Sequence, residues 1–264
     1  MRIIPVLNAN NRHAHFYLAV IRLEQVVKVC FVLDGLTRRG TIRSMVAVPP
    51  GFRGYDPCKP VDVYHRNLPH WRQEGASYTV TFRLEDALPS AVREEVREEI
   101  QRFKRCKENG VDVTVGTPSW LRYQKRVGKR VNDVLDQGIG EAILRQTDIA
   151  LLVADIMGRR EGEDYHLFAY VVMPNHCHAI VAPMADKSLE AIIQAWKSIS
   201  AREINRRLNR RGRVWQAEYY DRIVRDETEY RRAVEYILQN PSKAGLGDGK
   251  TPVWHWRGGE GAAD

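Results

Sequence analysis

The chain has 264 residues, a formal net charge of +8 and a pI near 9.4, so it can hold one catalytic domain with extensions but not two full domains. The longest apolar run near the start, residues 26–33, is short and interrupted by Lys28, so we expect neither a membrane span nor a secretory signal. Four widely spaced cysteines argue against a thiolate metal site or a disulfide framework and favour the cytoplasm. The excess of basic residues makes a polyanion a plausible partner, although a solvated basic surface would look the same.

Residues 1–54 show no sustained periodicity. We expect them to form an extension that is disordered or lies upstream of the true start, because Met45 offers an internal methionine. Residues 55–256 are expected to form the catalytic domain and residues 257–264 a flexible tail. From residue 55 the pattern sharpens: Ser77–Leu84 alternates as a half-buried strand, and Leu88–Lys107 is charged and helical.

The remaining elements follow in chain order. We predict two more helices, then two antiparallel strands joined at Pro174-Asn175, then a helix, a strand and a last helix that ends before Pro241. This order predicts an α+β fold, a ferredoxin-like antiparallel sheet with helices packed on it. The expected ranges are helices at 119–136, 147–158, 188–209 and 226–240, and strands at 165–173, 176–182 and 215–224.

The second strand of the hairpin contains two histidines. His176 and His178 are two residues apart, so in a strand they share a face and lie about 7 Å apart along it. Two neutral imidazoles held at a fixed separation are a suitable start for a divalent metal site. A pair of satisfied polar residues at a strand edge is the competing interpretation, and a third ligand would decide between them.

The last predicted helix carries two polar residues away from its apolar stripe. Asp226 and Glu229 resemble a capping box, which fixes where the helix begins. Tyr236 lies well outside the stripe and Asn240 lies one turn further on, nearly on the same side. Both could be solvated, or they could project together toward a site elsewhere. The stripe itself consists of Tyr230, Ala233, Val234, Ile237 and Leu238.

Five ordered blocks of this chain resemble the REP-associated tyrosine transposases, a branch of the single-tyrosine, IS200-like HUH transposases. The resemblance covers residues 55–256, and residues 1–54 have no counterpart in it. The blocks are LPHWRQEGASYTVTFRL, YVVMPNHCHAIVAP, AWKSISAREIN, VWQAEYYDRIVRD and YILQNPSKAGL, which begin at Leu68, Tyr170, Ala195, Val214 and Tyr236.

The resemblance implies the HUH endonuclease fold and a metal-dependent enzyme that cuts and rejoins single-stranded DNA. His176 and His178 become ligands of Mg or Mn, Asn240 takes the place of a polar third ligand, and Tyr236 becomes the nucleophile. A phenol is a poor nucleophile near neutrality, so position and the field of the ion must activate it. The product would be a 5′-phosphotyrosine and a free 3′-OH, which needs no nucleotide cofactor to be rejoined.

The resemblance also implies hairpin DNA from REP-like palindromes as the partner of a monomer or homodimer in the cytoplasm, associated with the nucleoid. The arginine-rich end of the fourth predicted helix suits phosphate contacts, although a solvated face would have the same composition. Two other functions stay open at this point: a domesticated binder of palindromic repeats, and a metal-dependent hydrolase that activates water. The predicted DNA-binding residues are Lys197, Arg202, Arg206, Arg213 and Lys243.

Overall fold

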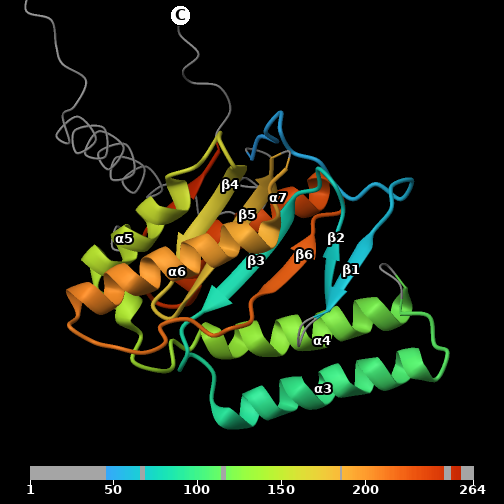
Figure 1. Ribbon diagram of the computed structural model, residues 1–264, viewed down its shortest axis with the longest axis horizontal. Coiled ribbons are helices and arrows are strands. Elements are labelled where there is room, and N and C mark those ends of the chain that lie inside the picture. The colour runs from blue at the N-terminus through green and yellow to red at the C-terminus, as the bar shows by residue number, and fades with distance from the viewer. Residues whose placement is uncertain (1–45, 66–68, 114–116, 185, 247–250, 257–264) are drawn as a thin grey trace, which may run out of the picture.

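The computed structural model describes residues 46–65, 69–113, 117–184, 186–246 and 251–256, which form a mixed α+β protein (Figure 1). The expected tail and residues 1–45 of the expected extension lie outside these ranges. The strands are β1 (Asp62–His65), β2 (Pro69–Arg72), β3 (Tyr78–Arg83), β4 (Tyr165–Val172), β5 (His176–Pro183), β6 (Tyr220–Ile223) and β7 (Val253–His255). The helices are α3 (Ser90–Glu108), α4 (Pro118–Leu135), α5 (Thr147–Gly158), α6 (Leu189–Arg207) and α7 (Glu227–Lys243), with a 3-10 turn at Ile143–Arg145.

The main sheet has five strands in the order β6-β3-β5-β4-β7, and every neighbouring pair is antiparallel. If β3, β4, β5 and β6 are numbered one to four along the chain, their spatial order is 4-1-3-2. This is the ferredoxin-like arrangement, with helices between the first and second strands and α6 between the third and fourth. The predicted fold class is therefore confirmed.

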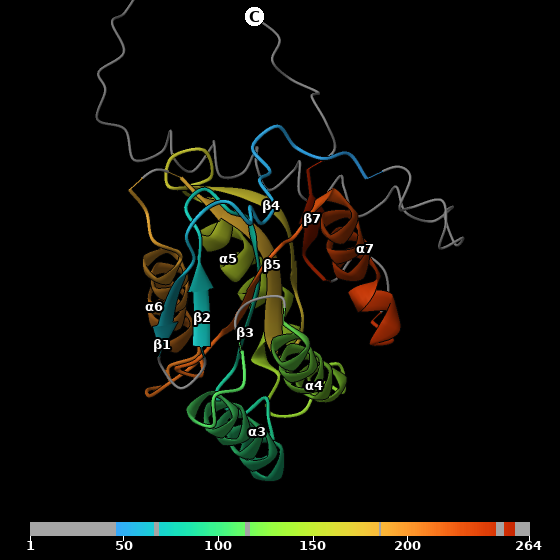
Figure 2. The same cartoon turned by 90° about the vertical axis from the view of Figure 1, so that its right-hand side faces the viewer.

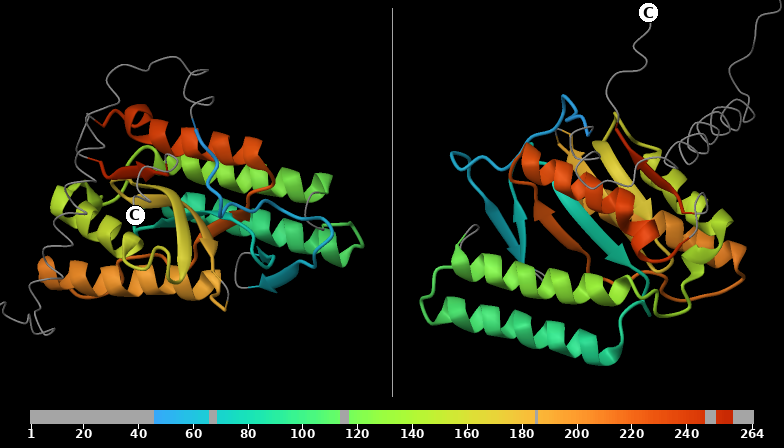
Figure 3. Two further views of the ribbon diagram at one scale, coloured as in Figure 1. Left: turned by 90° about the horizontal axis from the view of Figure 1, so that it is seen from above. Right: turned by 180° about the vertical axis from the view of Figure 1, so that it is seen from behind.

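Helices cover both faces of this sheet (Figure 2). Helices α5 and α6 lie on one face, while α7 and α4 lie on the other. Seen from behind, α7 crosses β4 and β5, and α4 runs below it toward β6, with α3 alongside α4 (Figure 3, right). The face under α7 and α4 is called the α7 face below, and the opposite face is called the α6 face.

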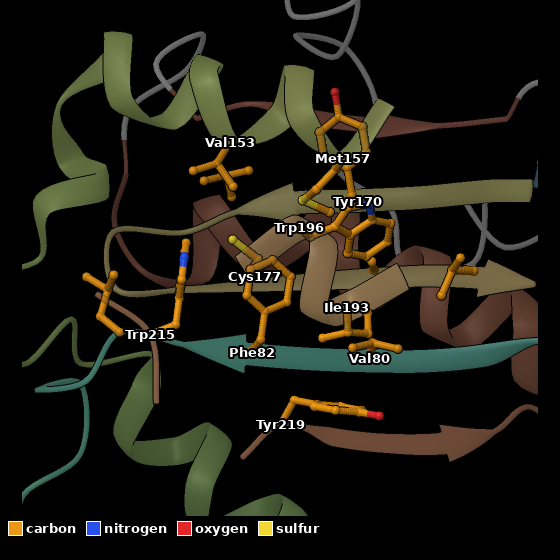
Figure 4. Close-up of a cluster of buried hydrophobic side chains, with 14 of the residues drawn as sticks. Val80, Phe82, Val153, Met157, Tyr170, Cys177, Ile193, Trp196, Trp215 and Tyr219 are labelled. Carbon is orange, nitrogen blue, oxygen red and sulfur yellow. The ribbon is translucent and has the colours of Figure 1, made fainter. Parts of the chain in front are cut away.

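The core on the α6 face contains several aromatic residues among its aliphatic side chains (Figure 4). Phe82 of β3 lies between the rings of Trp196 and Trp215, with centroids 6.2 and 4.9 Å away. Trp196 is 3% exposed and its indole donates to the Tyr165 hydroxyl, so it is a core residue. Cys177 points into the same cluster, as expected for the residue between two histidines that face the other way.

A second, smaller core lies on the α7 face and includes residues upstream of position 55. Val46 and Phe52 are buried there, and the Phe52 ring lies 4.9 Å from that of Tyr230 in α7. The backbone joins in as well, because the Arg53 carbonyl accepts a hydrogen bond from Ser77 N. The structure therefore places residues 46–54 in the packed domain, and the domain boundary expected after residue 54 does not mark the edge of the packed structure.

Three short strands, β1, β2 and β7, are not predicted by the sequence pattern. The hairpin of β1 and β2 and the edge strand β7 have three or four residues each, too few to show a clear alternation. Strand β7 pairs with β4 and extends the sheet beyond the four ferredoxin-like strands. Along the chain, the two long helices α3 and α4 follow β3 and precede α5. They pack side by side as an additional pair of helices and are held together partly by ion pairs between Glu95 and Arg130 and between Glu99 and Arg126.

Candidate functional site

The two histidines of β5 lie on the α7 face. His178 is the register partner of Thr81 and His176 that of Arg83, so all four side chains emerge on the same side of the sheet. Both imidazoles are buried, and their Nε2 atoms are 3.0 Å apart. The rings are nearly perpendicular, with centroids 4.6 Å apart. Their Nε2 lone pairs therefore converge on one point under α7.

Hydrogen bonds fix the tautomer of His176. The buried Asn175 side chain donates through Nδ2 to the Ile139 carbonyl, at 2.9 Å, and a carbonyl can only accept. Its Oδ1 is therefore the atom that faces His176 Nδ1, at 2.7 Å, and Nδ1 must carry the proton. His176 Nε2 is consequently left with a free lone pair. Partners of this kind orient metal-binding histidines in general.

Thr81 gives His178 more freedom. Its hydroxyl lies 2.8 Å from His178 Nδ1, and a hydroxyl can donate or accept. Without an ion, His178 can carry its proton on Nε2 and donate to His176, with Thr81 donating to Nδ1. With a cation held by both Nε2 atoms, His178 would carry its proton on Nδ1 and donate a hydrogen bond to the Thr81 hydroxyl oxygen.

Both histidines are neutral at physiological pH. Burial lowers the pKa of His178 to about 3. Burial also lowers the pKa of His176 far below its usual value, and a protonated His178 and the charge of Arg83 would each lower it further. Neutral imidazoles are the form that binds a metal ion.

Helix α7 carries Tyr236 to this pair. Asp226 caps the helix by accepting from Glu229 N at 2.8 Å, as expected, while the Glu229 carboxylate accepts from Arg225 N. The Tyr236 hydroxyl lies 3.5 Å from His178 Nε2, and the two rings have centroids 5.2 Å apart. The helix continues past Pro241 to Lys243, so its predicted end is wrong: a proline in the last turn removes one hydrogen bond without ending the helix.

Asn240 lies one turn beyond Tyr236. The residue is 1% exposed, and neither of its polar atoms reaches hydrogen-bond geometry with another described residue, although its amide lies near the Tyr236 hydroxyl. An unpaired buried amide is costly, so a cation bound by its carbonyl oxygen would satisfy it.

These residues fit a divalent cation. The Nε2 atoms of the two histidines lie 3.0 Å apart, close enough for one cation to be held by both. In the part of the chain described, no group of three or more His, Cys, Asp or Glu side chains could hold a metal. Such an ion would therefore depend on His176, His178 and the Asn240 carbonyl oxygen, with open positions left for substrate.

The phenol of Tyr236 is strongly disfavoured as an anion. Burial, together with the charges of Asp136 and Asp133 at the end of α4, raises its pKa to about 12, and the nearby Asn240 amide opposes part of the rise. One carboxylate oxygen of Asp136 is buried without a hydrogen-bond partner in the described structure. The Lys243 ammonium lies 5.2 Å from the Tyr236 ring centroid and supplies positive charge beside the nucleophile. Of the predicted DNA-binding residues, Lys243 is the one whose charged group contacts the site.

The other predicted DNA contacts come from α6 and the loop after it, and α6 covers the opposite face of the sheet. Arg202 is exposed there, and Arg206 is paired with Glu203 at 2.8 Å. Lys197 is 8% exposed and donates to the Ala217 carbonyl, so its position gives no support to a phosphate contact. Arg213 is exposed just before Val214, whose carbonyl accepts from Glu85 N at the end of the sheet that holds the histidines.

The adjacent tyrosines of the fourth block point to opposite faces, as the strand pattern predicts. Tyr219 packs in the core on the α6 face and accepts a hydrogen bond from Arg72. Tyr220 shares the α7 face, since it is the register partner of Thr81. Two strand spacings separate it from His178, or about 10 Å.

Sequence reasoning missed Thr81, Asn175, Arg83 and Asp136. Asn175 had a signal, because it directly precedes the first histidine at the hairpin turn. Thr81 and Arg83 sit two apart on a predicted strand, so a shared face was readable, but which face required the register. Asp136 comes from a helix whose docking no local pattern reveals.

Comparisons with known proteins agree with this site. Residues 146–240, just over a third of the chain, match the family model described as "Transposase IS200 like". This segment contains the histidine pair and ends at Asn240, so the resemblance to the IS200-like transposases is confirmed there. Among solved structures, the chain is similar to a REP-associated tyrosine transposase bound to a REP hairpin, at 17% identity over 68% of this chain and 76% of that one, with a TM-score of 0.34. No curated protein matches the chain.

The described helices include none with the length and apolar character needed to cross a bilayer.

Proposed function

We propose that the protein is a metal-dependent endonuclease and strand transferase for single-stranded DNA, with Tyr236 as its nucleophile. The observation that carries this proposal is the contact between the Tyr236 hydroxyl and His178 Nε2, at 3.5 Å. It brings a phenol, two lone-pair nitrogens and the unpaired Asn240 amide to one point. The match of residues 146–240 to IS200-like transposases supports the same chemistry.

The reaction is a transesterification. The Tyr236 oxygen loses its proton and bonds to the phosphorus, the bond from phosphorus to the 3′ oxygen breaks, and that oxygen takes up a proton. A divalent ion on His176, His178 and Asn240 would neutralise charge on the phosphate and the leaving oxygen. The chain's own contribution is position: α7 is capped, packed on the sheet and rigid, so it holds the phenol where an in-line attack is possible.

The same site can rejoin DNA. The 5′-phosphotyrosine retains the energy of the cleaved phosphodiester, so a 3′-OH from another strand can attack it and release Tyr236. Lys243 beside the ring would stabilise the phosphate in both steps. Hairpin DNA of the REP type, which the solved neighbour binds, is the proposed substrate class, and the protein would act at the nucleoid as a monomer or homodimer.

Covalent capture tests this proposal. We expect the wild-type protein, labelled single-stranded hairpin DNA and Mn²⁺ to give an adduct that survives denaturation. Tyr236→Phe removes only the nucleophilic oxygen and should abolish the adduct, while Tyr220→Phe, on the same face but farther away, should retain it. An adduct that persists in Tyr236→Phe would overturn the assignment. Hairpin binding with no adduct in any variant would indicate a repeat-binding protein.

The metal ligands have their own test. His176→Ala and His178→Ala should each abolish the adduct but leave hairpin affinity nearly unchanged, because binding does not require the ion. Retained cleavage in the double variant would exclude the metal site.

A further inference from the structure

Arg83 is a buried arginine beside the two histidines. It ends β3 as the register partner of His176, so its side chain emerges on the α7 face next to that imidazole. The residue is 7% exposed. Its charge is close enough to contribute to the lowered pKa of His176.

The hydrogen bonds of Arg83 leave its outer end free. Nε donates to Gln216 Oε1 at 2.7 Å, and Gln216 is held in turn because its own amide donates to the Glu85 carbonyl at 3.1 Å. Within the described residues, neither terminal nitrogen of the guanidinium donates to a protein acceptor, and no carboxylate lies within ion-pair distance. The guanidinium is therefore anchored on one edge and unpaired on the other.

This state contrasts with the other half-buried arginines of the sheet. Arg72 is paired with both Asp221 and Glu190, and Arg222 is paired with Glu229. Burial of a charge without a partner is costly, and proteins normally avoid it. Burial lowers the pKa of Arg83 to about 10, partly opposed by Glu218, so the group still carries its charge at neutral pH.

We propose that Arg83 binds the non-bridging oxygens of the scissile phosphate through its two free terminal nitrogens. The inference rests on the proposed function and names a further catalytic residue for it. A planar guanidinium suits a phosphate because it donates two parallel hydrogen bonds. The anion would supply a directly paired counter-charge, whereas Glu218 acts on Arg83 only through space.

The role of Arg83 is electrostatic. As the Tyr236 oxygen bonds to phosphorus and the 3′ oxygen leaves, the phosphate oxygens carry the charge of the transition state, and Arg83 stabilises it without giving up a proton. The same contact holds the phosphate of the phosphotyrosine for the second step. Donors fixed in advance around a developing charge are among the largest contributions to catalysis.

Two variants of Arg83 and one control test the proposal. In single-turnover cleavage, Arg83→Gln should be slower by about 100-fold, as for the loss of one preorganised donor. Arg83→Lys should recover part of the lost cleavage rate, because lysine restores the charge but not the bidentate hydrogen bond to the phosphate. Arg159→Gln removes an exposed arginine that directly follows α5 and should match the wild type. Thermal melts of all variants identify any loss due to unfolding.

A substrate change separates phosphate binding from a structural role. A methylphosphonate at the cleavage position lacks one charged oxygen, so it should bind Tyr236→Phe protein more weakly than the natural phosphodiester. In a protein with both Tyr236→Phe and Arg83→Gln, the loss of affinity caused by the methylphosphonate should be clearly smaller, because only Lys243 and any bound ion still interact with the missing charge. An equally large loss without Arg83, or wild-type cleavage by Arg83→Gln, would overturn the proposal while the tyrosine mechanism stands.

Failure of the proposed function would look different. If wild-type protein forms no adduct, the role of Arg83 is tested by measuring the binding of inorganic phosphate with ³¹P NMR. Wild-type protein should then bind phosphate at least about tenfold more tightly than Arg83→Gln, as for a hydrogen bond to a charged group. Equal affinities would show that the free guanidinium binds no anion.

Discussion

Replacing Asn175 with alanine removes the two hydrogen bonds that fix His176, to Ile139 and to His176 Nδ1. The imidazole can then rotate or change its tautomer, which places a proton on the Nε2 that should bind the ion. Loss of such an orienting partner typically weakens metal affinity 10-fold to 100-fold, or about 1.4–2.8 kcal/mol. The fold is also weakened, by about 1–3 kcal/mol for each buried group left unpaired.

A second variant separates these two effects. Asn175→Asp keeps an oxygen that accepts from His176 Nδ1, but its other oxygen faces the Ile139 carbonyl, and the carboxylate is fully buried. We expect Asn175→Asp to destabilise the fold more than Asn175→Ala does and yet to retain metal affinity. Asn175→Asp should therefore have the higher metal affinity of the two variants but the lower free energy of unfolding.

Mn²⁺ titration followed by electron paramagnetic resonance gives the affinity, and urea unfolding of the metal-free protein gives the stability. His176→Ala supplies the baseline for a site without this ligand. If both variants lose affinity in proportion to their loss of stability, Asn175 has only a structural role and the tautomer argument is refuted.

Four further outcomes are expected. Asn240→Ala should weaken Mn²⁺ affinity by about 10-fold to 100-fold without changing hairpin affinity, and unchanged Mn²⁺ affinity would exclude it as a ligand. Asp136→Asn removes a charge that raises the pKa of Tyr236, so NMR of labelled tyrosine should show this pKa falling below about 12. Phe52→Ala should cost about 3–5 kcal/mol in urea unfolding, as for a core aromatic, whereas a dispensable extension would give no change. Burial lowers the pKa of His70, but the hydrogen bond to Asp221 and the Glu218 carboxylate 3.7 Å away outweigh it and raise this pKa to about 9. The stabilisation by His70, up to about 3 kcal/mol, is therefore present below pH 6.5 and lost as pH rises through 9, and His70→Gln should abolish that part of the pH dependence.

Local patterns in the sequence were sufficient for the elements that carry the chemistry. Two histidines two residues apart on a strand must share a face, whatever the strand pairs with. The cap at Asp226 and the apolar stripe of α7 together fix the side on which Tyr236 and Asn240 emerge, and the structure has both features. These properties depend on backbone periodicity and near-neighbour hydrogen bonds, which are encoded within a few residues.

The other residues of the site are brought to it only by the tertiary structure. Thr81 and Arg83 reach the histidines through the pairing of β3 with β5, and Asp136 reaches Tyr236 through the docking of α4. The predicted arginines of α6 are exposed, but the sequence pattern of a helix does not determine which face of the sheet the helix covers. Likewise, the lack of periodicity in residues 46–54 concealed Phe52, which is held by contacts with Tyr230 and Phe168 rather than by a pattern of its own. Periodicity depends on neighbouring residues in the chain. The register of the strands, the face on which a helix docks and the pairing of a buried charge depend on contacts between segments that are far apart in the sequence.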